Sequence, residues 1–170
     1  MNSIDTWEVA HIALAVDDLD RWMAIYGKLF PGRWTSVLVL DRPWLAPLTE
    51  EGTIQAKCRL AWRNGQSPTL ELLEGPEGSP WYVEPGTHRL DHIGYWASDM
   101  QGQANLLLQA GYELEYTEPR SIDGKLVGFA YFRHPDGIRV ELQASDERAA
   151  FEVWKDDGAP LELTWGHHAP

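Results

Sequence analysis

Hydrophobic positions along the chain follow the same order of patterns twice. Two short apolar segments begin with His-Ile, at His11 and at His92, and each reaches an aspartate seven residues later. Apolar residues then recur at steps of three and four, the spacing of a helix that buries one face. These positions are Leu19, Trp22, Met23, Tyr26 and Phe30 in the first copy and Ala104, Leu107, Leu108 and Gly111 in the second. The candidate N-caps are Asp17 or Asp18 and Ser98 or Asp99. Each half is therefore predicted to start with a strand and a helix.

Three apolar segments of strand length follow each predicted helix. They are Trp34 to Leu40, Ile54 to Trp62 and Thr69 to Leu73 in the first half, and Tyr112 to Thr117, Leu126 to Phe132 and Ile138 to Gln143 in the second. Asn-Gly at 64–65 and Asp-Gly at 136–137 precede the last strand of each half, and both dipeptides are typical of turns. The repeat therefore predicts two β-α-β-β-β modules of an α+β fold.

The stretch between the two modules is rich in proline and glycine. It has the sequence GPEGSPWYVEPG, from Gly75 to Gly86, and such a composition is typical of a linker. We therefore divide the chain into a first module over residues 1–75, a linker over 76–88, a second module over 89–144, and a C-terminal helix and tail over 145–170. The last part begins with an acidic and aromatic helix candidate, Asp146 to Trp154.

Composition and charge limit the classes of partner. The chain has 170 residues and a formal net charge of −12, which repels nucleic acid and anionic lipid, so we expect neither as a partner. The N-terminal residues do not resemble a signal peptide, and no apolar run of about 20 residues is present, so we expect a soluble cytoplasmic protein. The single cysteine, Cys58, lies in an apolar run and is expected to be a buried filler. The nine tryptophans either fill the core or line an apolar cavity.

Four side chains that can bind a metal occupy equivalent positions in the two modules. His11 and His92 lie in the first strand of each module, and Glu71 and Glu141 lie in the last, between apolar neighbours. A carboxylate in an apolar strand is unfavourable unless it is paired, hydrogen-bonded or bound to a metal. Each residue alone has an ordinary explanation, such as solvent exposure of Glu71 between two leucines. Their fourfold coincidence favours one shared metal site.

Two imidazoles and two carboxylates favour particular metals. This mixed nitrogen and oxygen set suits one divalent ion of Zn, Ni, Co, Mn or Fe(II) better than copper(I) or Ca²⁺. Four protein ligands leave one or two coordination positions in a five- or six-coordinate ion. Water or the oxygens of a small-molecule substrate can fill those positions.

At these residues the sequence resembles the vicinal oxygen chelate superfamily, which includes glyoxalase I, methylmalonyl-CoA epimerase, extradiol dioxygenases and bleomycin-resistance proteins. The resemblance runs from about residue 8 to residue 144 and rests on AHIALAVDDL, PTLELLEGP, LDHIGYWASD and YFRHPDGIRVEL. It implies two β-α-β-β-β modules whose mixed sheets curl around a metal cleft. The family's metal ligands come from the first and last strands of each module, and those positions match His11, Glu71, His92 and Glu141.

Within the superfamily, the pattern is most similar to the glyoxalase and epimerase branch. Extradiol dioxygenases do not use the position of Glu71 as a ligand, methylmalonyl-CoA epimerases typically have glutamine there, and bleomycin-resistance proteins lack the ligands. Bacterial glyoxalase I has the same four residue types, but it is shorter, and the tail after Ser145 has no counterpart in it. The negative net charge argues mildly against anionic glutathione or coenzyme A conjugates as substrates.

The resemblance implies a metal-dependent isomerase, epimerase or lyase that removes a proton beside a metal-bound carbonyl and passes through an enediolate. The base would be Glu141 or, by pseudo-symmetry, Glu71, and the sequence does not choose between them. Two alternatives remain open: an Fe(II) ring-cleaving dioxygenase and a non-catalytic protein that binds a small drug-like ligand. Family modules complete their barrels within one chain or across two, and we expect a homodimer.

Overall fold

The computed structural model of the chain describes residues 7–40, 46–47, 57–65, 67–118, 121 and 125–157, with the backbone alone at 46–47 and 156–157. Within these ranges nine strands and three α-helices are present. The strands are β1 (Glu8–Val16), β2 (Leu38–Leu40), β3 (Ala46–Pro47), β4 (Cys58–Arg63), β5 (Thr69–Glu74), β6 (His88–Ala97), β7 (Glu113–Thr117), β8 (Phe129–Arg133) and β9 (Arg139–Ala144). The helices are α1 (Leu19–Leu29), α2 (Met100–Gln109) and α3 (Arg148–Asp157), the last preceded by the 3₁₀ turn η2 (Ser145–Glu147).

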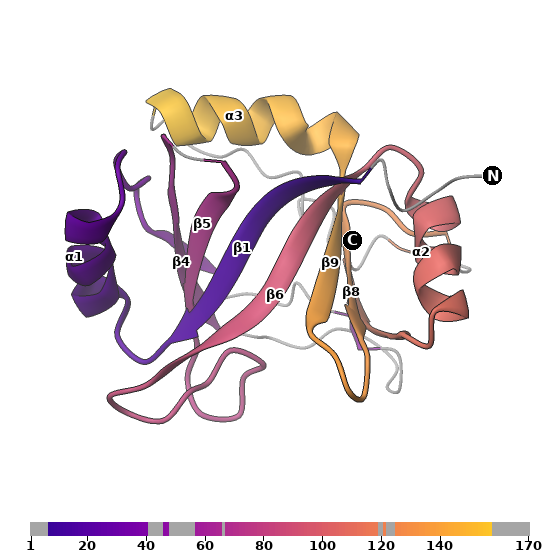
Figure 1. Ribbon diagram of the computed structural model, residues 1–170, viewed down its shortest axis with the longest axis horizontal. Helices are drawn as coiled ribbons and strands as arrows, with labels where there is room; N and C mark the ends of the chain where they lie inside the picture. The colour runs from indigo at the N-terminus through magenta and orange to yellow at the C-terminus, as the bar shows by residue number, and fades with distance from the viewer. Residues whose placement is uncertain are drawn as a thin grey trace, which may run out of the picture.

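Both modules contribute to one curled sheet, in the order β2-β4-β5-β1-β6-β9-β8-β7-β3. The first strands of the modules, β1 and β6, pair antiparallel at its centre, whereas β1 pairs parallel with β5 and β6 pairs parallel with β9. Figure 1 shows α1 and α2 at opposite ends of this sheet. The predicted α+β fold of two β-α-β-β-β modules with mixed, curled pairing is therefore confirmed.

Each module folds locally as its sequence pattern indicates. The side chains of Asp18 and Asp99 cap α1 and α2, accepting hydrogen bonds of 2.9 Å from the backbone N–H groups of Arg21 and Gly102. The apolar stripes of these helices cover one face of the sheet. The cluster under α1 contains Val16, Leu19, Ala61, Leu70 and Leu72, and the cluster under α2 contains Ala97, Ala104, Leu107, Ala130, Phe132, Val140 and Leu142.

The opposite face of the sheet carries a third cluster that is dominated by large rings. Its ring-bearing members, called here the aromatic cluster, are Trp62, Trp81, Trp96, Phe129, Tyr131, Phe151 and Trp154, all buried. Phe151 and Trp154 come from α3, which runs across the ends of β4, β5 and β1 in Figure 1. Cys58 is buried in the same cluster, as its apolar run predicts.

Several predicted boundaries differ from the observed ones. In the segment 34–40 the strand is limited to β2, and Trp34 forms an isolated bridge with Arg63. The strand expected from Leu126 begins only at Phe129, since the N–H of Val127 donates to Ser121 Oγ. The first residues of the segment 54–62 lie outside the described residues, and its described part forms β4. Among the described helices, none has the length and apolar character needed to cross a membrane.

Candidate metal centre

Each of the four central strands supplies one of the candidate ligands. His11 lies on β1 and His92 on β6, the two strands that pair at the centre of the sheet. Glu71 on β5 and Glu141 on β9 flank them on either side. Because side chains alternate along a strand, all four point to the face that carries the aromatic cluster. The edge-to-edge pairing of the modules thus brings their equivalent residues to one place.

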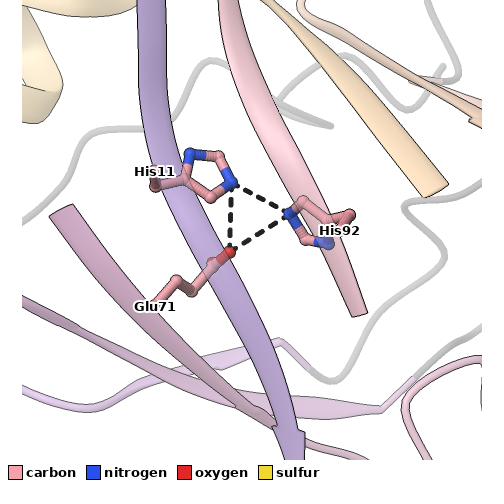
Figure 2. Close-up of side chains that lie close together, drawn as sticks. All are labelled: His11, Glu71 and His92. Atoms are coloured by element: carbon pink, nitrogen blue, oxygen red, sulfur yellow. Dashed lines mark hydrogen bonds and ion pairs between the residues drawn. The ribbon is translucent and has the colours of Figure 1, made fainter. Parts of the chain in front are cut away.

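The donor atoms of these residues meet at short distances. The Nε2 atoms of His11 and His92 lie 2.9 Å apart, and Oε2 of Glu71 lies 3.3 and 3.4 Å from them. Figure 2 shows these three groups pointing toward one another. Oε2 of Glu141 lies 2.9 Å from His11 Nε2 and 3.2 Å from His92 Nε2. Both histidines are fully buried, and both glutamates are 5% exposed.

The two histidines and Glu71 of this donor set fit a divalent metal ion. Metal–nitrogen and metal–oxygen bonds are about 2.0–2.2 Å long, so neighbouring ligand atoms around one ion lie about 3 to 3.5 Å apart. The distances between the histidine nitrogens and the carboxylate oxygens fall in that range. Two ring nitrogens that face each other and two carboxylates in a buried space also call for a positive charge between them. His11, Glu71 and His92 form a group whose donor atoms lie close enough together to hold an ion, and Glu141 is not in that group.

Burial and hydrogen bonds shift the pKa values of Glu141 and His92 in opposite directions. Burial alone raises the pKa of Glu141, but hydrogen bonds from His11 and His92 outweigh it and lower that pKa to about 2. Burial alone lowers the pKa of His92, but hydrogen bonds to Asp91, Glu141 and Glu71 raise it well above its usual value. Before a metal binds, the cluster therefore holds ionised carboxylate around a protonated imidazole.

Asp91 positions the imidazole of His92 through the Nδ1 atom, a role that the sequence pattern did not indicate. A register shift in the β1–β6 pairing matches Ala13 with His92 and Leu14 with Leu90, so Asp91 is an extra, bulged residue. Its side chain therefore reaches the same face as that of His92, and its Oδ2 accepts a 2.9 Å hydrogen bond from His92 Nδ1. That bond leaves the Nε2 atom of His92 free to face the other ligands.

Two arginines hold Asp91 in turn. Nη1 of Arg139 donates to both carboxylate oxygens at 2.9 and 3.1 Å, and Nη1 of Arg89 donates to Oδ1 at 2.6 Å. Arg139 also donates to Glu115 at 2.8 and 3.1 Å. Burial alone raises the pKa of Asp91, but its bond to His92 and the two arginine charges lower it to about 2. Asp91 therefore stays ionised and keeps its orientation.

The equivalent position in the first module differs. A second register shift makes Ala10 the bulged residue before His11, and alanine offers no hydrogen bond. Among the described residues, Nδ1 of His11 has no hydrogen-bond partner. The imidazole of His11 is instead held by packing, because it lies against Gly94 of β6, where a Cβ atom would overlap the ring. Gly94 is a second contributor to the site that the sequence pattern did not indicate.

The two glutamates also differ in what holds them. Trp62 Nε1 donates a 2.7 Å hydrogen bond to Oε1 of Glu71, the oxygen that faces away from the histidines. The indole of Trp62 is stacked on Phe151 of α3, with ring centroids 4.9 Å apart, and packs against Trp154 at 5.7 Å. For Glu141, the polar contacts within the described residues are those to the two histidines. The carboxylate of Glu71 is therefore held in place by Trp62, whereas the carboxylate of Glu141 has no such additional hydrogen bond among the described residues.

A family profile described as the Glyoxalase/Bleomycin resistance protein/Dioxygenase superfamily matches residues 10–131. The chain belongs to this superfamily. The match includes His11, Glu71 and His92 and ends before Glu141 and α3. No curated protein is a significant match to the sequence.

Solved structures of the glyoxalase-like superfamily share the fold. A variant of Streptomyces coelicolor methylmalonyl-CoA epimerase, in complex with 2-nitronate-propionyl-CoA, matches with 22% identity and a TM-score of 0.53, over 81% of this chain and 96% of that one. Methylmalonyl-CoA epimerase from Mycobacterium tuberculosis matches with 18% identity and a TM-score of 0.50, over 85% and 92%. A mutant of Streptomyces coelicolor 4-hydroxymandelate synthase matches with 14% identity and a TM-score of 0.55, over 81% and 48%. At these identities the likeness concerns the fold alone.

Proposed function

We propose that this superfamily member is a divalent-metal-dependent isomerase, epimerase or lyase that uses His11, Glu71, His92 and Glu141 as metal ligands. The observation that carries this proposal is the convergence of two imidazole nitrogens and two carboxylate oxygens, all buried, with nitrogen–nitrogen and nitrogen–oxygen distances of 2.9–3.4 Å. We expect the metal to be Zn, Ni, Co, Mn or Fe(II). The substrate is a small molecule with two adjacent oxygens.

The differences between the two glutamates support a division of roles. A bound divalent ion supplies positive charge that stabilises negative charge on the oxygens of the substrate. Glu71, held by Trp62, serves as a fixed ligand. Glu141 takes the proton from the carbon beside the carbonyl group, which leaves the substrate as an enediolate. Glu141 then returns the proton to the same carbon in an epimerase or to the neighbouring carbon in an isomerase.

A second candidate function is an Fe(II) ring-cleaving dioxygenase. It is supported by the grouping of His11, His92 and one carboxylate, because two histidines and one carboxylate also suit Fe(II) oxygen chemistry. A fourth ligand would favour the first function, since it would leave fewer open positions for oxygen and substrate together. Oxygen consumption by the Fe(II)-loaded protein with catechol as the probe separates the two.

The test of the first function combines metal analysis with hydrogen exchange. Protein purified without added metal should contain about one divalent ion per chain, whereas a non-catalytic binding protein would contain none. In D₂O, the metal-loaded protein should place deuterium on the carbon beside the carbonyl of 2-hydroxyacetophenone, a small neutral α-hydroxyketone.

Two conservative variants then assign the roles of the glutamates. Glu141→Gln should retain metal but lose about a hundredfold to ten-thousandfold of the exchange rate. Glu71→Gln should mainly weaken metal binding. If both variants exchange at the parental rate, neither glutamate is the base and the proton-transfer mechanism is wrong.

We further propose that the protein is a homodimer in the cytoplasm. Family modules complete their barrels either within one chain or across two, and we expect two chains to associate. Sedimentation showing only monomer at micromolar concentration would contradict it, and fractionation of the producing cells tests the location.

A further inference from the structure

Gln143 is a buried polar residue on the strand that carries Glu141. It lies two residues further along β9, so its side chain points to the same face, with the two Cα atoms about 6.6 Å apart. Its side chain is 1% exposed. The side-chain oxygen Oε1 is buried and has no hydrogen-bond partner among the described residues.

The surroundings of Gln143 are apolar, so its buried amide destabilises the folded protein when no ligand is bound. Its neighbours across the sheet are Trp96 on β6 and Phe129 on β8, two members of the aromatic cluster. The equivalent residue of the first module, two positions after Glu71, is the apolar Leu73. A buried acceptor without a donor destabilises the fold, and leucine of similar volume would avoid that. A donor that arrives with a ligand explains why glutamine occupies the position.

We propose that Gln143 accepts a hydrogen bond from the substrate and thereby selects it. This inference rests on the proposed function, in which two adjacent oxygens of the substrate face the four ligands. The spacing along β9 then places a hydroxyl or N–H group of the substrate about 5–8 Å from those oxygens. The rings of Trp96 and Phe129, which lie on either side of Gln143 in the sheet, favour a flat apolar body. The substrate class is an aromatic or similarly apolar compound with a distal hydrogen-bond donor.

Charges near the site favour a neutral compound. Arg139, on the same strand as Gln143, is occupied by Asp91 and Glu115. Lys155, at the end of α3 near Trp62, is paired with Glu152 at 3.0 Å. The two cations are therefore neutralised by carboxylates, and they give no attraction to an anionic substrate.

A pair of chelating probes tests the selection directly. 4-Hydroxybenzohydroxamate and 4-methoxybenzohydroxamate both present two adjacent oxygens, but only the hydroxyl compound carries a distal donor. Titration calorimetry on the Zn²⁺-loaded protein should show that the hydroxyl compound binds about threefold to tenfold more tightly, the range expected of one hydrogen bond. Gln143→Leu should remove this preference while Zn²⁺ affinity stays unchanged.

The metal-free protein supplies a readout that is independent of any ligand. Gln143→Leu should leave the melting temperature unchanged or raise it, because an unpaired acceptor is removed. Gln103→Leu is the matched control: Gln103 on α2 is also buried, but its Oε1 accepts a hydrogen bond from the N–H of Asp99 at 3.4 Å. That variant should lower the melting temperature and keep the probe preference.

The outcomes separate the selection by Gln143 from the proposed function itself. If both probes bind but Gln143→Leu keeps the preference, or melts as early as Gln103→Leu, the amide is structural and the inference is wrong. If neither hydroxamate binds the Zn²⁺-loaded protein, the metal-centred function is wrong, and the selection by Gln143 falls with it.

Discussion

The indole N–H of Trp62 and the carboxylate of Glu71 are joined by a hydrogen bond of 2.7 Å. This bond connects the candidate metal centre to α3, because Trp62 is stacked on Phe151 and packs against Trp154. The family match ends before α3 begins. A helix outside the matched region therefore supports a side chain inside it.

Replacing Trp62 with phenylalanine should weaken metal binding about tenfold to hundredfold, the usual effect of losing a hydrogen bond to a metal ligand. Phenylalanine keeps a ring against Phe151, so most of the packing remains. The dissociation constant is measured by competition with a fluorescent chelator. Trp154→Phe is the control, since it changes the same packing and leaves the N–H of Trp62 in place. Equal affinity of Trp62→Phe and the parent would show that the bond is irrelevant to the metal.

Asp91→Asn should also lower metal affinity about tenfold to hundredfold, because the neutral amide holds the imidazole of His92 less firmly. Glu115→Gln is the control, as it loosens Arg139 from the other side without touching His92. The same chelator competition measures both variants. A larger loss in Glu115→Gln than in Asp91→Asn would argue against a role of Asp91 in orienting His92.

The metal-free protein should become less stable as the pH rises from about 6 to about 8. The pKa of His92 is raised well above 6.5 in the folded state, so the folded chain holds a proton that the unfolded chain releases in this interval. The stabilisation is complete below pH 6.5 and declines above it, by up to about 1.4 kcal/mol per pH unit. Urea unfolding at several pH values measures the slope.

Two controls accompany that measurement. The His92→Gln variant should lose the slope, and the metal-loaded protein should lack it because a bound metal replaces the proton. A metal-free stability that is constant or increases between about pH 6 and 8 contradicts the protonation of His92.

The sequence predicted the fold, and it brought out the four candidate ligands, because both inferences depend on a repeat. Strand, helix and strand lengths recur in the two halves, and a buried glutamate at equivalent places in both is hard to explain singly. In contrast, strict alternation along β6 would place Asp91 on the face opposite to His92. The bulge that brings them together depends on pairing with β1, which leaves no local pattern in the sequence.

The roles of Trp62 and α3 could not be predicted from the sequence for a related reason. Trp62 ends an apolar run, and periodicity alone marks it only as a core residue. The helix after Ser145 was expected from its composition, but its position on the sheet depends on contacts between residues about 90 positions apart in the chain, as between Trp62 and Phe151. The short strand β3 was not predicted, because it consists of two residues that pair with β7 of the second module.

The central pairing of β1 with β6 has a consequence for inheritance and for engineering. It places the candidate ligands from both halves of one polypeptide in the same sheet, so the proposed centre would lie within a single chain even when two chains associate. Chains that lack His11 and chains that lack His92 should therefore fail to rescue each other when they are co-expressed, since exchange of subunits cannot assemble the four ligands. Activity regained in such a mixture would mean that the halves combine between chains. If the halves do not combine between chains, a mutation in one copy of the gene inactivates only the chains made from that copy.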